Sequence, residues 1–122
     1  MRKLIAVVVL VLGFAFTSNA QDVKKVALEQ TKGEFTQKAL TLSQGTYVFN
    51  IINSNVGTKV GFVLVPKGKS VADANNHIKS AYVTEVVENN TIGNTNEVTL
   101  TKGEYVYFCP LNKTPQYTLT VE

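Results

Sequence analysis

Short segments that alternate apolar and polar residues, with turn residues between them, constrain the fold of this chain most strongly. The clearest is 47–53, where Tyr47, Phe49 and Ile51 share one face with the spacing of a strand. Many short segments at this spacing predict an all-β sandwich or barrel. The predicted strands cover residues 23–30, 35–42, 47–53, 62–65, 98–101, 105–109 and 117–121.

One segment follows a different pattern. Ser70 and Asp73 form a capping-box-like start, and the apolar residues after them recur at helical spacing. These apolar residues are Val71, Ala74, Ile78 and Tyr82. The pattern predicts one short helix over 71–81, lying on the sandwich by its apolar side. Residues 81–87 fit either a continuation of the helix or a strand, and the Asn- and Gly-rich segment 88–96 is typical of a loop.

The first twenty residues have the pattern of a secretory signal peptide. Arg2 and Lys3 precede an apolar run from Leu4 to Phe16, and small residues precede a cleavage point after Ala20. The apolar run is shorter than the ~20 residues that a membrane span needs. We therefore expect a signal peptide at 1–20, one domain at 21–122, a periplasmic or secreted location and no stable membrane anchor.

The charge of the domain argues against two classes of partner. Without Arg2 and Lys3, ten of the 12 basic side chains remain beside nine acidic ones, so the net charge falls from +3 to +1. No basic cluster is left that would attract phosphates, which argues against nucleic acid and against an anionic membrane surface as partners.

Two separated blocks of the chain resemble the cupredoxins. The first runs from Gly103 to Pro110, where a turn glycine leads through alternating aromatics to a Cys, and a strand-like segment at 117–122 follows. The second runs from Gly45 to Asn53, followed by a loop and the apolar segment 60–64. The resemblance implies a Greek-key β-sandwich of the cupredoxin type, into which the predicted helix is inserted.

The resemblance also implies positions for the ligands of a type 1 copper site, which needs two His nitrogens, a Cys thiolate and a weak axial ligand. Carried over to this sequence, the Cys is Cys109, the first His falls near Thr58, the second falls at Asn112 and the axial Met falls near Pro115. The chain has one His in all. We therefore expect a degenerate site and no cofactor, with copper at Cys109 as the alternative.

Cys109 and His77 each allow more than one interpretation. Cys109 could be a small buried core residue, a retained metal ligand, or a reactive thiol that forms an intermolecular disulfide, but no internal disulfide is possible with one Cys. His77 falls on the flank of the predicted helix, where it is either a plain surface residue or a second metal ligand beside Cys109.

Sequence motifs of known enzymes are absent: there is no phosphate-binding glycine loop, no zinc-protease motif and no recognisable nucleophile motif. The sequence therefore favours a non-enzymatic binding or accessory module with an unknown envelope or extracellular protein as its partner. A copper-binding or electron-transfer protein with an atypical site at Cys109 is the alternative, and a purely structural surface domain is the third possibility.

Overall fold

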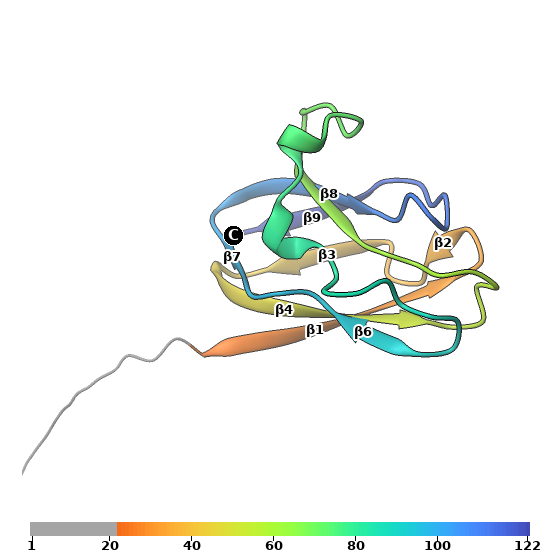
Figure 1. The fold of residues 1–122 in the computed structure, drawn as a ribbon. Helices are drawn as coiled ribbons and strands as arrows, with labels where there is room; N and C mark the ends of the chain where they lie inside the picture. The colour runs from red at the N-terminus through yellow and green to blue at the C-terminus, as the bar shows by residue number, and fades with distance from the viewer. Residues whose placement is uncertain (1–21) are drawn as a thin grey trace, which may run out of the picture.

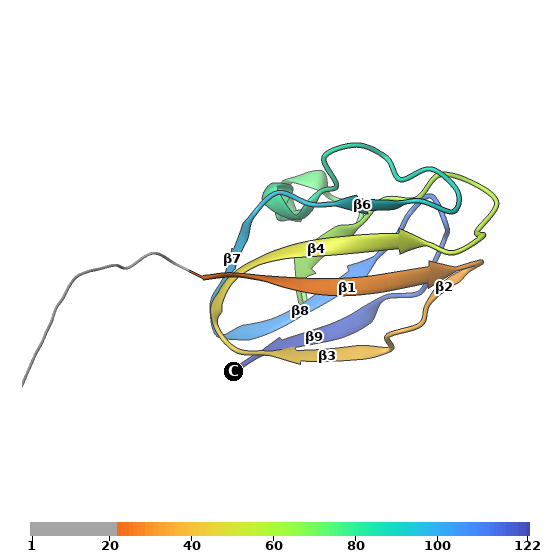
Figure 2. The ribbon, with the colours of Figure 1, turned by 90° about the horizontal axis from the view of Figure 1, so that it is seen from below.

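A computed structural model describes residues 22–122 as two β-sheets that face each other (Figures 1 and 2). The predicted signal peptide lies outside the described residues. One sheet joins β2, β1, β4 and β6 in that order, with β7 also paired to β4, and the other joins β3, β9, β8 and β5. The strands are β1 (Val23–Thr31), β2 (Glu34–Phe35), β3 (Ala39–Leu42), β4 (Gly45–Asn53), β5 (Val63–Pro66), β6 (Ile92–Asn94), β7 (Val98–Leu100), β8 (Gly103–Phe108) and β9 (Tyr117–Val121).

The pairing of the strands is mixed. β1 runs parallel to β4, and β3 runs parallel to β9. The remaining ladders are antiparallel, including β5 with β8 and β8 with β9. Parallel neighbours cannot be joined by a tight hairpin, so the chain has to cross between the two sheets to form them. The predicted all-β sandwich is confirmed.

The core between the sheets is built from the faces that the alternation predicted. Tyr47, Phe49 and Ile51 of β4 are buried, as are Tyr105 and Tyr107 of β8. Inside the sandwich, aromatic rings contact one another in edge-to-face or tilted pairs. Their centroid distances are 5.2–6.1 Å, which is the range that aromatic pairs favour. The rings of this cluster belong to Phe35, Phe49, Phe62, Tyr107 and Tyr117.

A repeated corner motif connects the two sheets. At the β3–β4 connection the hydroxyl of Tyr47 donates to the carbonyl of Ser43 at 2.7 Å, and at the β7–β8 connection the hydroxyl of Tyr105 donates to the carbonyl of Thr101 at 2.8 Å. In both corners a glycine with positive φ, 157° or 152°, stands two residues before the tyrosine. The same local chemistry thus fixes these two of the crossings between the sheets, β3–β4 and β7–β8.

The predicted helix at 71–81 is wrong. The segment instead forms two short 3₁₀ turns, Ala74–Asn76 and Lys79–Ala81, with His77 and Ile78 extended between them. The N–H of Ile78 donates to the carbonyl of Leu64 in β5 at 2.9 Å. This N–H is therefore not available for the main-chain hydrogen bond that an α-helix would need at this position. This tertiary bond outweighs a weak local preference, because Asn and Asp are poor helix formers.

Two further boundaries differ from the prediction. The expected strand at 35–42 is interrupted after Phe35, because Thr36 and Gln37 bond across to Glu29 and end the pairing of β2. The expected loop at 88–96 contains β6, which pairs Ile92 with Ile52 of β4. Gly93 of β6 favours a turn in the sequence, but in the structure it is paired with Ile51 of β4.

That glycine, Gly93, gives a first prediction. A Cβ on Gly93 would lie 2.6 Å from Cγ2 of Val87, a side chain that is itself buried. We expect Gly93→Ala to lower the free energy of unfolding by about 2 kcal/mol through overpacking. Urea unfolding followed by circular dichroism measures the change. Gly61→Ala is the matched control, because its nearest atom would be a valine methyl at 4.0 Å. Equal losses in both variants would contradict the steric explanation.

Tyr107 gives a second prediction, for alkaline pH. Burial, with a smaller effect of the neighbouring Tyr117 phenol, raises the pKa of Tyr107 to about 12. Unfolded tyrosine titrates near ~10, so above that pH the unfolded chain loses this proton first and binds fewer protons than the folded one. Stability is therefore unaffected below about pH 10 and falls as the pH rises toward 12. Urea midpoints at pH 9 and pH 11 check this, and Tyr107→Phe should show a smaller drop.

Candidate functional site

Cys109 lies directly after β8, fully buried, at the end of the sandwich where the loop 110–116 leads into β9. Its Sγ accepts two main-chain hydrogen bonds, from the N–H of Gly61 and from the N–H of Asn112, each at 3.3 Å. The loop is closed by Thr114, whose hydroxyl accepts from the N–H of Cys109 at 2.9 Å. The thiol is thus held between the segment before β5 and the loop after β8.

The two residues that donate to the thiol are also joined to each other through Gln30. The side-chain amide of Gln30 donates to the carbonyl of Gly61 at 2.9 Å, and its Oε1 accepts from Nδ2 of Asn112 at 3.1 Å. The bonds close a ring that runs from Cys109 through Gly61, Gln30 and Asn112 back to Cys109, here called the Cys109 ring. All four residues are buried. Buried polar groups that are fully paired in this way fix the segments that carry them.

Asn112 ties the ring to the β1–β2 hairpin. Its Oδ1 accepts from the N–H of Gly33 at 2.8 Å, and its Nδ2 donates to the carbonyl of Thr31 at 2.8 Å as well as to Gln30. The side chain therefore uses its carbonyl oxygen and both N–H groups within the protein. An amide engaged in this way has no donor atom left for another role.

The other two positions implied by the resemblance are at the surface, whereas Cys109 is fully buried. Thr58 is exposed, and its carbonyl accepts from the side-chain amide of the buried Asn53 at 2.8 Å. Pro115 is exposed, and its carbonyl accepts from the hydroxyl of Thr114. Of the three positions, the structure brings Asn112 alone into contact with Cys109. Gly61 and Gln30, which the sequence analysis did not select, complete the contacts.

His77 is half-buried, and both of its ring nitrogens are engaged. Nε2 lies 2.7 Å from the carbonyl of Val71, and Nδ1 lies 2.7 Å from the hydroxyl of Tyr82. Because a carbonyl can only accept, Nε2 carries the proton, and in the neutral ring Nδ1 accepts from Tyr82. The ring also meets Phe108 edge to face. Both hydrogen bonds thus lie within the projecting loop between β5 and β6 and hold it together, and the ring contact with Phe108 packs the loop against β8.

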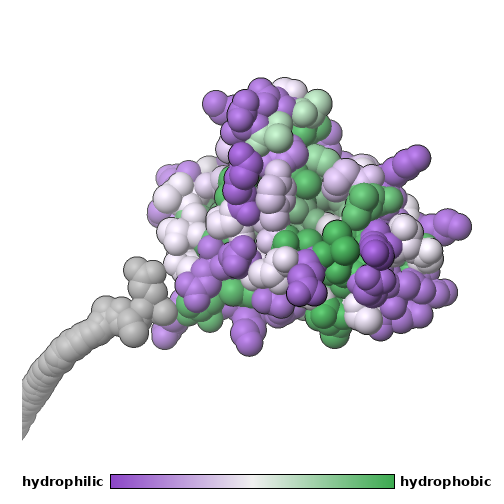
Figure 3. Space-filling view, viewed as in Figure 1, coloured by the Kyte–Doolittle hydropathy of each residue, from purple (hydrophilic) through white to green (hydrophobic). Residues whose placement is uncertain are grey.

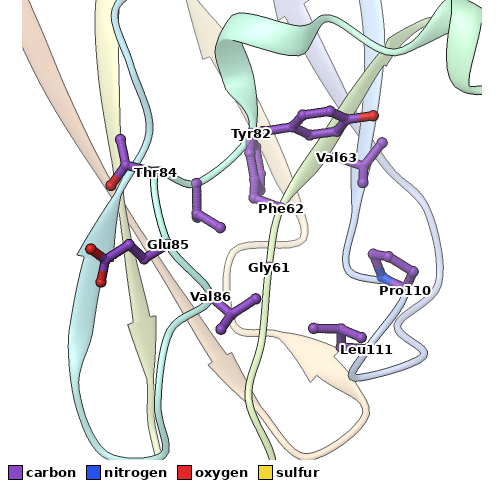
Figure 4. Close-up of a pocket in the computed structure, with 10 residues that line it drawn as sticks. Gly61, Phe62, Val63, Tyr82, Thr84, Glu85, Val86, Pro110 and Leu111 are labelled. Atoms are coloured by element: carbon purple, nitrogen blue, oxygen red, sulfur yellow. The ribbon is translucent and has the colours of Figure 1, made fainter.

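An apolar groove of about 410 Å³ lies beside the Cys109 ring. One wall is the main chain from Gly61 to Val63, the other is the segment from Tyr82 to Val86, and Pro110 and Leu111 close one side (Figure 4). Val86 and Leu111 are 48% and 49% exposed, unusually high values for large apolar side chains. Figure 3 shows apolar surface gathered where the segments that lead into β5 and β6 run, whereas the projecting loop is mostly hydrophilic.

Two kinds of feature are absent from residues 22–122. No group of three or more His, Cys, Asp or Glu side chains is placed to hold a metal ion in this part of the chain. No helix of the described residues is long and apolar enough to cross a membrane.

Comparison with solved structures identifies the fold. The chain is similar to auracyanin B (TM-score 0.66, 21% identity, covering 86% of this chain and 92% of that one). It is also similar to auracyanin A, a blue copper protein from the green thermophilic photosynthetic bacterium Chloroflexus aurantiacus (TM-score 0.65, 20% identity, 83% and 100%). A third neighbour is the dithionite-reduced auracyanin from the photosynthetic bacterium Roseiflexus castenholzii (TM-score 0.64, 16% identity, 81% and 97%).

No family model and no curated protein sequence matches the chain. The structural neighbours nevertheless confirm the predicted cupredoxin-like Greek-key sandwich. The inserted helix alone has to be withdrawn from that description, because two 3₁₀ turns stand in its place.

Proposed function

We propose that this protein is an exported, cupredoxin-like binding module that works without a type 1 copper site, in the periplasm or as a secreted protein. The observation that carries the proposal is the Cys109 ring. Asn112, at the position implied for the second His ligand, has its amide bound to Gln30, Thr31 and Gly33. Hydrogen bonds between side chain and main chain thus hold together the segments that meet at this end of the sandwich.

The donor set around Cys109 does not fit a type 1 copper ion. Such a site needs two imidazole nitrogens beside the thiolate. The single histidine of the chain, His77, has both nitrogens bound, to Val71 and to Tyr82. Thr58 and Pro115 are exposed. The contacts that Cys109 makes are therefore those of a structural residue, and they support a function that needs no metal and no catalysis.

The groove beside the ring is the surface on which binding would occur. It is lined mainly by apolar side chains, and two of these that are exposed, Val86 and Leu111, stand on opposite sides of Gly61 (Figure 4). Exposed apolar surface of this kind marks interaction sites in soluble proteins. A protein of the envelope or of the extracellular space is the partner class we propose.

Copper loading tests the proposal and is our third prediction. We expect the purified mature protein, mixed with equimolar Cu(II), to develop no intense thiolate-to-copper absorption in the visible range. After dialysis, metal analysis should find less than about one tenth of an equivalent of copper. Auracyanin A, treated in parallel, is the positive control. An intense visible band from the wild-type protein would sink the proposal.

A copper-binding or electron-transfer role with an atypical site at Cys109 is the second candidate. The observation in its favour is the likeness to auracyanin A, a blue copper protein, together with a cysteine kept at the end of β8. This candidate predicts copper that survives dialysis and is lost in Cys109→Ala. Equal retention by the wild-type and Cys109→Ala proteins would exclude it.

A further inference from the structure

The groove contains a short stretch of strand edge. β5 pairs with β8 on one side, where Val63 lies opposite Phe108 and Val65 lies opposite Val106. The N–H of Lys67 continues this side by donating to the carbonyl of Glu104. In an antiparallel ladder, alternate residues direct their main-chain groups to opposite sides. Leu64 and, by the same alternation one residue before β5, Phe62 therefore direct theirs away from β8, and of these two Phe62 lines the groove.

This outer edge is hydrogen-bonded at its two ends and unpaired between them. At one end Val60 and Val87 exchange two main-chain bonds of 2.9 Å, and at the other the carbonyl of Leu64 accepts from Ile78 at 2.9 Å. Between these closures, the N–H and the C=O of Phe62 have no hydrogen-bond partner among residues 22–122. The segment from Tyr82 to Val86 makes no main-chain hydrogen bond to this stretch, and both segments line the groove.

An unpaired main-chain pair at such a place is costly. Phe62 is 2% exposed, and its ring packs into the core against Phe35, Phe49 and Tyr107. Its N–H and C=O are therefore held in fixed directions beside apolar walls, where a missing hydrogen bond costs free energy. A strand from another chain, added to an open sheet edge, would supply both bonds.

We propose that the groove binds an extended peptide segment of a protein partner, one residue of which pairs with the N–H and C=O of Phe62. The side chain of the paired residue points inward, as the Phe62 ring does, so it has to be small. The residues on either side point outward over Gly61, which has no side chain, and an aliphatic residue there fits between Val86 and Leu111 (Figure 4).

The charge of the lining adds a second requirement. Glu85 is the charged residue among those that line the groove, and the rest of the lining is mainly apolar. A basic residue beside the aliphatic one complements Glu85, whereas an acidic one would be repelled by it. The proposal rests on the proposed binding function and adds to it the chemistry of the partner. The bound segment is extended, alternates a small residue with aliphatic ones, and carries a basic residue beside an aliphatic one.

The probe is the peptide acetyl-Lys-Val-Ala-Val-Lys-amide, whose symmetric pattern fits the groove in either chain direction. It is titrated into the ¹⁵N-labelled mature protein and followed by the amide resonances. One control peptide carries an N-methyl group on the alanine, which removes the donor that would pair with Phe62. A second carries Glu in place of both Lys. The control proteins are Leu111→Asp, within the groove, and Ile92→Asp, on β6 outside it.

We expect the largest downfield shift at the amide of Phe62, at least tenfold weaker binding for the N-methyl peptide, and about threefold weaker binding for the Glu peptide. Leu111→Asp should weaken binding at least tenfold and Ile92→Asp should not change it. If the Phe62 amide does not move at millimolar peptide, or if N-methylation has no effect, strand pairing is overturned. The proposed function fails separately, through a visible copper band in the wild-type protein.

Discussion

Asn112→Ala is expected to lower the free energy of unfolding by about 3 kcal/mol, a large fraction of the stability of a domain of this size. The substitution leaves three groups without their partner: Oε1 of Gln30, the carbonyl of Thr31 and the N–H of Gly33. The bond to Gln30 is buried, and those to Thr31 and Gly33 are part-buried. A buried group that loses its hydrogen bond loses more than the net value of an intact bond, because water does not replace the partner. Urea unfolding measures the loss.

Asn76→Ala is the matched control. Its amide donates a single exposed bond to the carbonyl of Ser70, so its loss should cost less than about 1 kcal/mol. A cycle with Gln30→Ala tests whether the Cys109 ring acts as a unit, since residues of one network are not additive. The double variant should then lose clearly less than the sum of the two single losses. A change below 1 kcal/mol for Asn112→Ala would show that the ring does not hold this end of the sandwich.

Leu111→Asp is expected to abolish capture of the partner while leaving the fold intact. The side chain is 49% exposed beside the groove, so a carboxylate there keeps its water in the free protein and has to lose it in a complex. Central apolar residues of an interface often contribute 2 kcal/mol or more, so affinity should fall at least about thirtyfold. The measurement is quantitative pull-down from the envelope fraction with immobilised mature protein.

Ile92→Asp separates the groove from apolar exposure in general. Ile92 is 67% exposed, more than Leu111, but it lies on β6 outside the groove. It should leave capture unchanged, and both variants should unfold within about 0.5 kcal/mol of the wild type, as surface substitutions generally do. If both variants lose the partner equally, or if neither does, the groove is not the binding surface.

The buried strands could be predicted because their pattern is local. β4 and β8 alternate cleanly, and the inward residues are the aromatic and aliphatic ones at both. The glycine–x–tyrosine corners at Tyr47 and Tyr105 are also present in the sequence, but the sequence pattern alone does not mark them as corners. Each corner is a few residues long, and its meaning depends on a hydrogen bond back to Ser43 or Thr101 that appears only in the fold.

The helix at 71–81 failed for the opposite reason. The apolar residues have helical spacing, but the N–H of Ile78 is bound to the carbonyl of Leu64 in β5. A pattern read within the segment 71–81 does not contain this contact. The site was partly predictable. Val26, Leu28 and Gln30 stand at alternate positions of β1, so a polar side chain on an inward face was visible in the sequence. Its partner was not, because Gln30 meets Asn112 across 82 residues.

The sequence by itself determined the class of fold and the lack of a second histidine, because alternation and composition do not depend on what lies across the core. The tertiary structure decided what surrounds Cys109. Hydrogen bonds between Gln30, Gly61, Asn112 and Cys109 join segments that are far apart in the chain, and their directions exist only after the sheets have packed. The same packing leaves the main-chain N–H and C=O of Phe62 unpaired beside the groove, which no residue pattern in the sequence predicts.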